Sequence, residues 1–250
     1  MDAQIHGTVL PVLEVTLNPG DTIVSEAGEM SWMSQSIEMT TTTQTAGAKG
    51  VMGVLKRAVA GGGIFMTEFR SGNGAGSVSF ATKMPGQILP VQVTPGSELM
   101  IQRSGFLCAT EGVELTIGFQ KKLGAGIFGG EGFILQRLEG SGEVFIHSGG
   151  TIVQMDLKQG EKLKVDTGCL VALDPTVDYD IEFVGGIKTA IFGGEGLFFA
   201  VMTGPGRVWV QTLPFARLAD RVMRAQHGGR EEVRRGGALG AIGDLISGDD

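Results

Sequence analysis

The chain has 250 residues, of which 42% are hydrophobic and 19% are charged, so it carries enough apolar side chains to fold around a core. The net charge is −7, and residues 1–214 carry all of it, with 14 basic and 21 acidic residues, which argues against nucleic acid as a partner. The two cysteines, Cys108 and Cys169, make no disulfide framework, and no signal segment or membrane-spanning run is visible, so we expect a cytoplasmic location.

Glycine is the unusual component of the composition, with 42 residues and no Gly-X-Y period. These glycines recur where short segments of alternating polarity would reverse direction, and such turns need a positive φ angle. In residues 161–166, Leu163 and Val165 alternate with charged residues, which is typical of a half-buried strand. The pattern predicts an all-β protein built from many short strands.

A unit of about 64 residues recurs along the chain. The turn glycine Gly96 has a counterpart at Gly160, and Gly130 of the motif Gly-Gly-Glu-Gly has one at Gly194, each 64 residues later. A looser first copy carries its turn glycine at Gly20. One common spacing at separate markers indicates internal duplication.

We therefore expect three repeats, over residues 5–90, 91–154 and 155–214, in one β domain covering 1–214. A single copy is too small to bury its own apolar face, whereas three copies about a pseudo-threefold axis would enclose one core. The predicted body is a β-sandwich or prism-like arrangement. Within the longer first copy, the spacing of apolar residues over 51–59 predicts a short helix.

Residues 215–250 change character and predict an arginine-rich helix followed by a flexible tail. Pro214 suits the beginning of a helix, and Arg217, Arg221 and Arg224 share its polar face. Two interpretations remain open. The helix packs back on the β body, or it lies on the surface and uses these three arginines to contact acidic lipid or a protein partner.

The repeated Gly-Gly-Glu-Gly motif provides the candidate ligand site. Glu131 and Glu195 would stand at equivalent positions, where two carboxylates can act as acid and base or bind a cation, although duplication alone explains their recurrence. The candidate ligand-binding residues are Glu131, Glu195, Gly130, Gly194, Lys122 and Lys188. Three scattered histidines and the lack of a phosphate-binding loop predict no metal site, no cofactor and no catalytic residue.

Several motifs carry a family resemblance: residues 53–59 leading into 63–69, the glycine motifs of 121–133 and 184–198, and 204–206 followed by 211–215. Through them the chain resembles the bacterial and mitochondrial family named for altered inheritance of mitochondria, up to about Arg224. The resemblance implies a fold similar to that of the tryptophan-RNA-binding attenuation protein, with three repeats and homo-trimers. Eukaryotic members imply a link to inner-membrane organisation, and so a place peripheral to the inner membrane.

One departure from the family pattern is Gly61-Gly62-Gly63, where the family has Gly-Glu-Ser. It leaves the first copy without the glutamate of the other two, which weakens a three-carboxylate site. The favoured hypothesis is a non-catalytic oligomeric scaffold or interaction protein. The alternatives are a small-molecule binding module, with its pocket near the glycine-rich turns, and an enzyme that uses Glu131 and Glu195.

Overall fold

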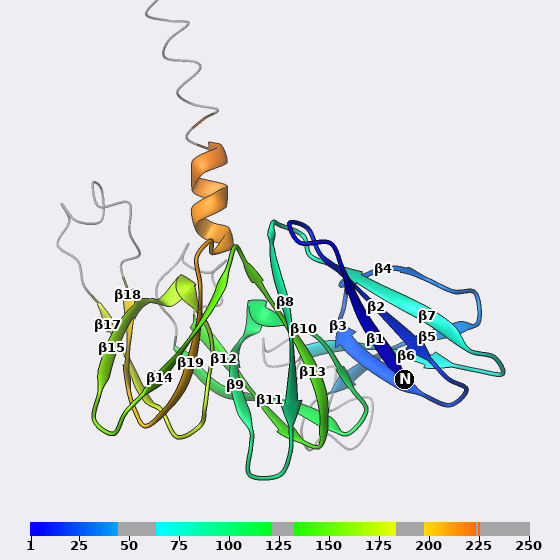
Figure 1. Ribbon diagram of the computed structural model, residues 1–250, viewed down its shortest axis with the longest axis horizontal. Coiled ribbons are helices and arrows are strands. Elements are labelled where there is room, and N and C mark those ends of the chain that lie inside the picture. The colour runs from blue at the N-terminus through cyan, green and yellow to red at the C-terminus, as the bar shows by residue number, and fades with distance from the viewer. Residues whose placement is uncertain (45–63, 122–132, 184–197, 224, 226–250) are drawn as a thin grey trace, which may run out of the picture. The chain divides into compact units, whose positions relative to one another are not determined.

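The computed structural model describes residues 1–44, 64–121, 133–183, 198–223 and 225. The chain divides into two compact units, Met1–Leu213 and Pro214–Asp250. In the described part of the first unit, 19 strands form four antiparallel sheets, which confirms the predicted all-β class (Figure 1). In the second unit, residues 215–223 form a helix. The helix predicted over 51–59 lies outside the described residues.

The strands fall into three successive sets of six, which we call set 1 (12–81), set 2 (86–149) and set 3 (152–211), with positions a to f in chain order. Set 1 contains β2 (Val12–Leu17), β3 (Thr22–Glu26), β4 (Met30–Met33), β5 (Ile37–Gln44), β6 (Ile64–Ser71) and β7 (Gly76–Ala81). Set 2 contains β8 (Gly86–Val93), β9 (Leu99–Gln102), β10 (Phe106–Thr110), β11 (Val113–Lys121), β12 (Phe133–Gly140) and β13 (Gly142–Gly149). Set 3 contains β14 (Ile152–Leu157), β15 (Lys162–Asp166), β16 (Leu170–Leu173), β17 (Asp178–Phe183), β18 (Phe198–Thr203) and β19 (Gly206–Gln211).

All three sets share the same internal pairing. Strand f pairs with a and with c, and strand e pairs with b and with d. Each set therefore consists of two three-stranded halves, a–f–c and b–e–d. One further strand, β1 (Asp2–His6), adds to β2 at the edge of set 1. Short 3-10 helices, Arg103–Gly105 and Thr167–Cys169, connect b to c in sets 2 and 3.

Successive sets are joined by pairing strand b of one set with strand c of the next. β3 pairs with β10, and β9 pairs with β16, which produces the two six-stranded sheets. The remaining halves form a four-stranded sheet with β1 and a three-stranded sheet of β15, β18 and β17. We call the b–c pairing the set junction. It is the only strand pairing between sets among the described residues.

The turn between strands a and b is the same in each set and requires glycine. Gly20, Gly96 and Gly160 have φ angles of +90°, +86° and +75°, in the region that disfavours a side chain. Each turn is closed by a backbone hydrogen bond, at 2.9 Å from Asp21 N–H to Asn18, with equivalents in the other two sets. The three glycines that mark the sequence copies therefore occupy one structural position.

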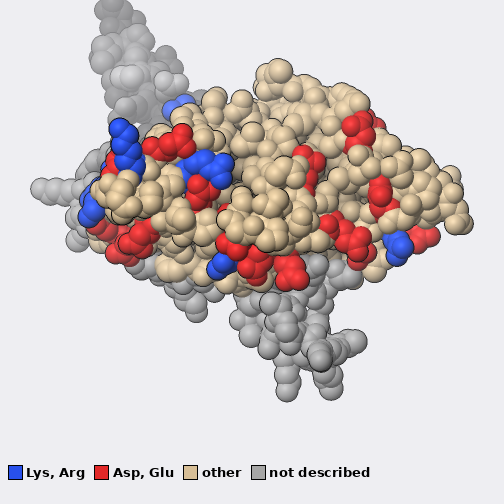
Figure 2. All heavy atoms as spheres, turned by 60° about the horizontal axis from the view of Figure 1, so that its bottom comes forward, with Lys and Arg blue, Asp and Glu red and all other residues tan. Residues whose placement is uncertain are grey.

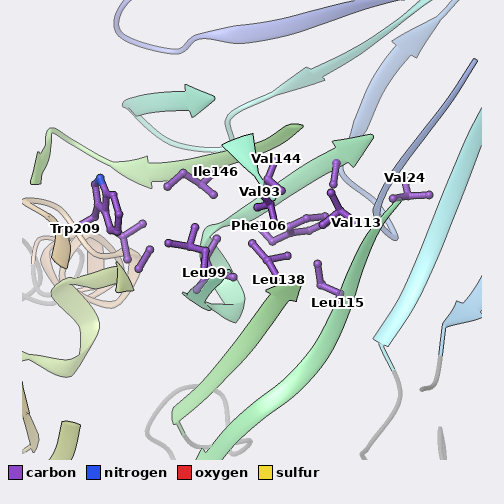
Figure 3. Packing of buried hydrophobic residues seen from close by; sticks show 14 of the residues in the cluster. Val24, Val93, Leu99, Phe106, Val113, Leu115, Leu138, Val144, Ile146 and Trp209 are labelled. Carbon is purple, nitrogen blue, oxygen red and sulfur yellow. The ribbon is translucent and has the colours of Figure 1, made fainter. Parts of the chain in front are cut away.

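The core lies between the two halves of each set. In set 2, buried residues from both six-stranded sheets meet, and Figure 3 shows Phe106 of β10 gathered with Val113, Leu138 and Val144. Two further clusters lie between the four-stranded sheet and the first six-stranded sheet, and between the second six-stranded sheet and the three-stranded sheet. Alternating side chains thus fill both faces of the shared sheets, because each six-stranded sheet contributes to two cores.

The positive φ of the a–b turn predicts the effect of adding a side chain there. Gly160→Ala has open space for its Cβ, so its cost is purely conformational, and we expect it to lower the free energy of unfolding by about 1 kcal/mol in urea titration. Gly74→Ala, which has equal space and no positive φ, is the matched control and should change it by less than about 0.5 kcal/mol. Equal costs for the two variants would contradict this account of the turn.

Candidate functional site

The ligand-binding residues proposed from the sequence fall in equivalent connections along the chain in sets 2 and 3. Lys122, Gly130 and Glu131 belong to the connection between β11 and β12, and Lys188, Gly194 and Glu195 to that between β17 and β18. These are the d–e connections of sets 2 and 3. All six residues lie outside the described residues, so the ligand site remains a prediction.

The strands that lead into these connections carry aromatic side chains that the sequence did not single out. Phe119 of β11 contacts Phe133 of β12 and Tyr179 of β17 edge to face, with ring centroids 6.5 and 5.2 Å apart. Burial raises the pKa of the Tyr179 phenol above its ordinary value, so the hydroxyl stays neutral at physiological pH. This aromatic group packs strands of sets 2 and 3 together.

A polar pair links sets 1 and 2 inside the protein. The Gln136 amide on β12 donates a hydrogen bond of 2.9 Å to the Glu26 carboxyl at the end of β3. Burial raises the pKa of the Glu26 carboxyl above its ordinary value of 4.5, although the Gln136 amide and the charge of Arg103 act in the opposite direction. Because the carboxyl loses solvation on folding, its ionised form lowers the free energy of unfolding.

The thiol and imidazole groups of set 2 lack the properties of a reactive pair. Cys108 is fully buried, and burial raises the pKa of its thiol well above the ordinary value. A protonated, inaccessible thiol is not a nucleophile. Burial lowers the pKa of the His147 imidazole. No cluster of three or more metal-ligating side chains occurs within the part of the chain that the structure describes.

The helix of the second unit carries two of the three arginines proposed for partner or membrane contact. Arg217 and Arg221 lie on residues 215–223, and Arg224 is outside the described residues. Phe215 is 70% exposed, and Val222 and Met223 are exposed as well. Among the residues with a described structure, no helix is long and apolar enough to cross a membrane.

Two strands have open edges that their counterparts in other sets do not have. The b strands of sets 1 and 2 each pair with a c strand of the following set, whereas β15 pairs only with β18 among the described strands. The c strands of sets 2 and 3 are likewise paired, whereas β4 pairs only with β7 among those strands. No sequence motif signals this feature, because local patterns do not encode which distant strand completes an edge.

The Glu26–Gln136 pair predicts a pH-dependent difference between variants. In Glu26→Gln an amide replaces the carboxyl, and we expect a higher midpoint of thermal unfolding than for the natural chain at pH 7. The reason is that the unfolded carboxyl ionises above pH 4.5 while the folded one resists ionisation, so the natural chain loses stability as pH rises. At pH 4 the carboxyl is largely protonated in both states and the advantage should shrink. A variant that is less stable at pH 7 would contradict the prediction.

Comparison with known proteins places the chain in a family. A family model described as "Mitochondrial biogenesis AIM24" matches residues 3–213. A protein of Streptococcus pyogenes serotype M6, described as the uncharacterized protein M6_Spy0233, is 26% identical over 218 residues, covering 86% of each chain. The crystal structure of protein SPYM3_0169 from Streptococcus pyogenes has a similar fold, with a TM-score of 0.73 at 23% identity, over 90% of this chain and 99% of that one. The chain belongs to the mitochondrial biogenesis AIM24 family.

Proposed function

We propose that the protein is a non-catalytic scaffold that assembles with copies of itself and presents surfaces to a membrane or protein partner. The observation that carries the proposal is the set junction, which occurs twice in the chain with the same strands in the same positions. A homo-trimer is the assembly expected from the family resemblance. The chemistry of the described residues supports binding surfaces more than a reaction centre.

The physical argument starts from the edges of a set. A set taken by itself has a row of unpaired backbone N–H and C=O groups at the edge of strand b and another at the edge of strand c. Such rows pair readily with further strands. Inside the chain the next set satisfies them, as β10 does for β3. A module whose edges are completed by its own copies is suited to building larger assemblies, and this is the property a scaffold needs.

The helix of the second unit supports a membrane-associated version of this function. It carries exposed apolar residues, Phe215 and Val222 among them, together with Arg217 and Arg221. Such a combination suits the interface of a membrane with anionic lipids. Acidic side chains are spread over the face of the protein that Figure 2 shows, so the helix is better suited than that face to meet an anionic surface.

The small-molecule alternative depends on the glycine-rich connections at 122–132 and 184–197, which lie outside the described residues. No observation on the described residues favours it over the scaffold. The enzyme hypothesis needs Glu131 and Glu195 in the same two connections, and it gains no support from the buried Cys108 thiol.

Self-assembly predicts the mass of the protein in solution. We expect light scattering to give about three times the chain mass of 26.2 kDa, for the full chain and for a chain ending at Pro214, because the junction strands all belong to the first unit. A mass of one chain at micromolar concentration, with a cooperative unfolding transition that shows the protein is folded, would contradict the scaffold proposal.

Membrane contact through the helix predicts a charge-dependent interaction with lipid. Arg217→Glu combined with Arg221→Glu should abolish co-sedimentation with phosphatidylserine-containing vesicles, because the reversed charges are repelled by the lipid. Lys83→Glu, in the first unit, provides a single charge reversal away from the helix and should retain binding. Equal binding by the natural chain and the double variant would remove the membrane version and leave the self-assembling scaffold.

A further inference from the structure

The two set junctions have the same register. In the first, Ser25 of β3 lies opposite Cys108 of β10. In the second, Ile101 of β9 lies opposite Ala172 of β16. Both junctions are antiparallel. In both, the pairing of the c strand with strand f of its own set shifts in register just before the junction residue, between Phe106 and Cys108 in β10 and between Leu170 and Ala172 in β16. The junction is therefore a defined structural element with a fixed register.

The position of Ile101 in set 3 is occupied by Val165. Ile101 faces Gln136 on strand e of its own set, and Val165 faces Ala200 on the equivalent strand, 64 residues further along in both cases. Val165 is half-buried, whereas Ile101 is fully buried beneath its junction partner. β15 thus carries the b half of a junction, and no described strand supplies the c half.

The position of Cys108 in set 1 is occupied by Trp32. Trp32 follows the same irregularity, between Met30 and Trp32, and it faces Ser79 on strand f as Cys108 faces Phe145. The side chain of Trp32 is 54% exposed, whereas that of Cys108 is fully buried. β4 thus carries the c half of a junction, with a large apolar residue at its centre.

The two open edges differ in their protection against pairing: β15 carries Lys162, Lys164 and Asp166, whereas β4 carries no charged residue. Sheet edges are commonly guarded by charged side chains, above all lysine. On β15 the Lys164 ammonium is held by the Glu182 carboxylate of β17 at 2.7 Å, on the far side of β18 from the open edge. The open edge of β4 presents Ser31, Trp32 and Met33, none of which is charged.

We propose that β15 of one copy pairs antiparallel with β4 of a second copy, with Val165 opposite Trp32 and Lys164 opposite Met33. This proposal rests on the scaffold function and specifies the contact that builds it. Among the described strands, each copy has one b strand and one c strand with an unpaired edge, β15 and β4, which lie toward opposite ends of the first unit in Figure 1. The contact is therefore head to tail, and copies close into a ring when the rotation between them closes. The third junction thus has the same form as the two inside the chain.

A cross-linking experiment tests the register. Residues opposite each other in antiparallel strands have Cα atoms about 4.5–5.5 Å apart, which suits a disulfide. In full-length chains carrying Cys169→Ser, equimolar Trp32→Cys and Val165→Cys chains are mixed and oxidised, with Cys108 buried and inert. The expected product on a denaturing gel is a dimer that forms in the mixture and in neither variant alone. The double variant should give a ladder of dimers and larger species.

The matched control shifts the register by one residue. Trp32→Cys mixed with Lys164→Cys should not cross-link, because adjacent residues of a strand point to opposite faces. Three outcomes overturn the proposal: no dimer in the Val165 mixture, a dimer of Trp32→Cys with itself, or a double variant that cross-links only within one chain. The last would show that β15 pairs with β4 of its own chain.

A second variant keeps the proposal testable if the cysteine chains fail to fold. Trp32→Glu places a charge at the centre of the proposed contact and should reduce the mass in light scattering to that of one chain with an unchanged circular dichroism spectrum. Met39→Glu is the control, because Met39 is 52% exposed on β5, an edge strand whose counterparts β11 and β17 are also edges among the described strands. It should keep the assembled mass. If the natural chain is assembled and Trp32→Glu remains so, the β15–β4 contact is wrong while the scaffold stands. If the natural chain is a monomer, both proposals fail.

Discussion

A strand edge that must be completed by another strand is the constraint on which the rest of this structure depends. Each set of six strands folds into two halves around a core, but the b and c strands remain with one side unpaired within the set. Unpaired backbone groups are costly when they are buried away from water. Pairing β3 with β10 and β9 with β16 meets this requirement twice and at the same time converts separate halves into two six-stranded sheets.

The same constraint connects fold to function. The junction joins one set to the next while each set keeps the same internal strand pairing. The same pairing could therefore join sets of different chains, as repeat architectures generate large surfaces from small units. The helix of residues 215–223 takes no part in the junctions between described strands. In the proposed scaffold, the junctions would hold the copies together and the helix would be available for a partner or lipid.

The sequence predicted the all-β class and the glycine turns, because both depend on local features. Gly96 and Gly160 were identified from their 64-residue spacing and Gly20 as the turn glycine of the looser first copy, and each has the positive φ that makes glycine necessary. The predicted limits after residues 90 and 154 fall within β8 and β14, since turn markers do not show which strand precedes the turn.

Less of the candidate site than of the fold could be predicted from the sequence. Its six ligand-binding residues lie outside the described structure, and the open edges have no local signature. Trp32 illustrates the difficulty. An aromatic residue in a short strand predicts core or interface equally well, and only the buried Cys108 at the equivalent position of set 2 distinguishes the two.

In the assembled protein, we expect β15 of one copy and β4 of the next to complete each other's open edges. Backbone hydrogen exchange on these two strands, followed as a function of protein concentration, tests it most directly. We expect their amides to become as protected as those of β9 and β10 when the protein assembles, while the amides of the edge strands β5 and β17 stay unchanged. Amides of β15 and β4 that exchange as fast as those of β5 and β17 at every concentration would contradict it.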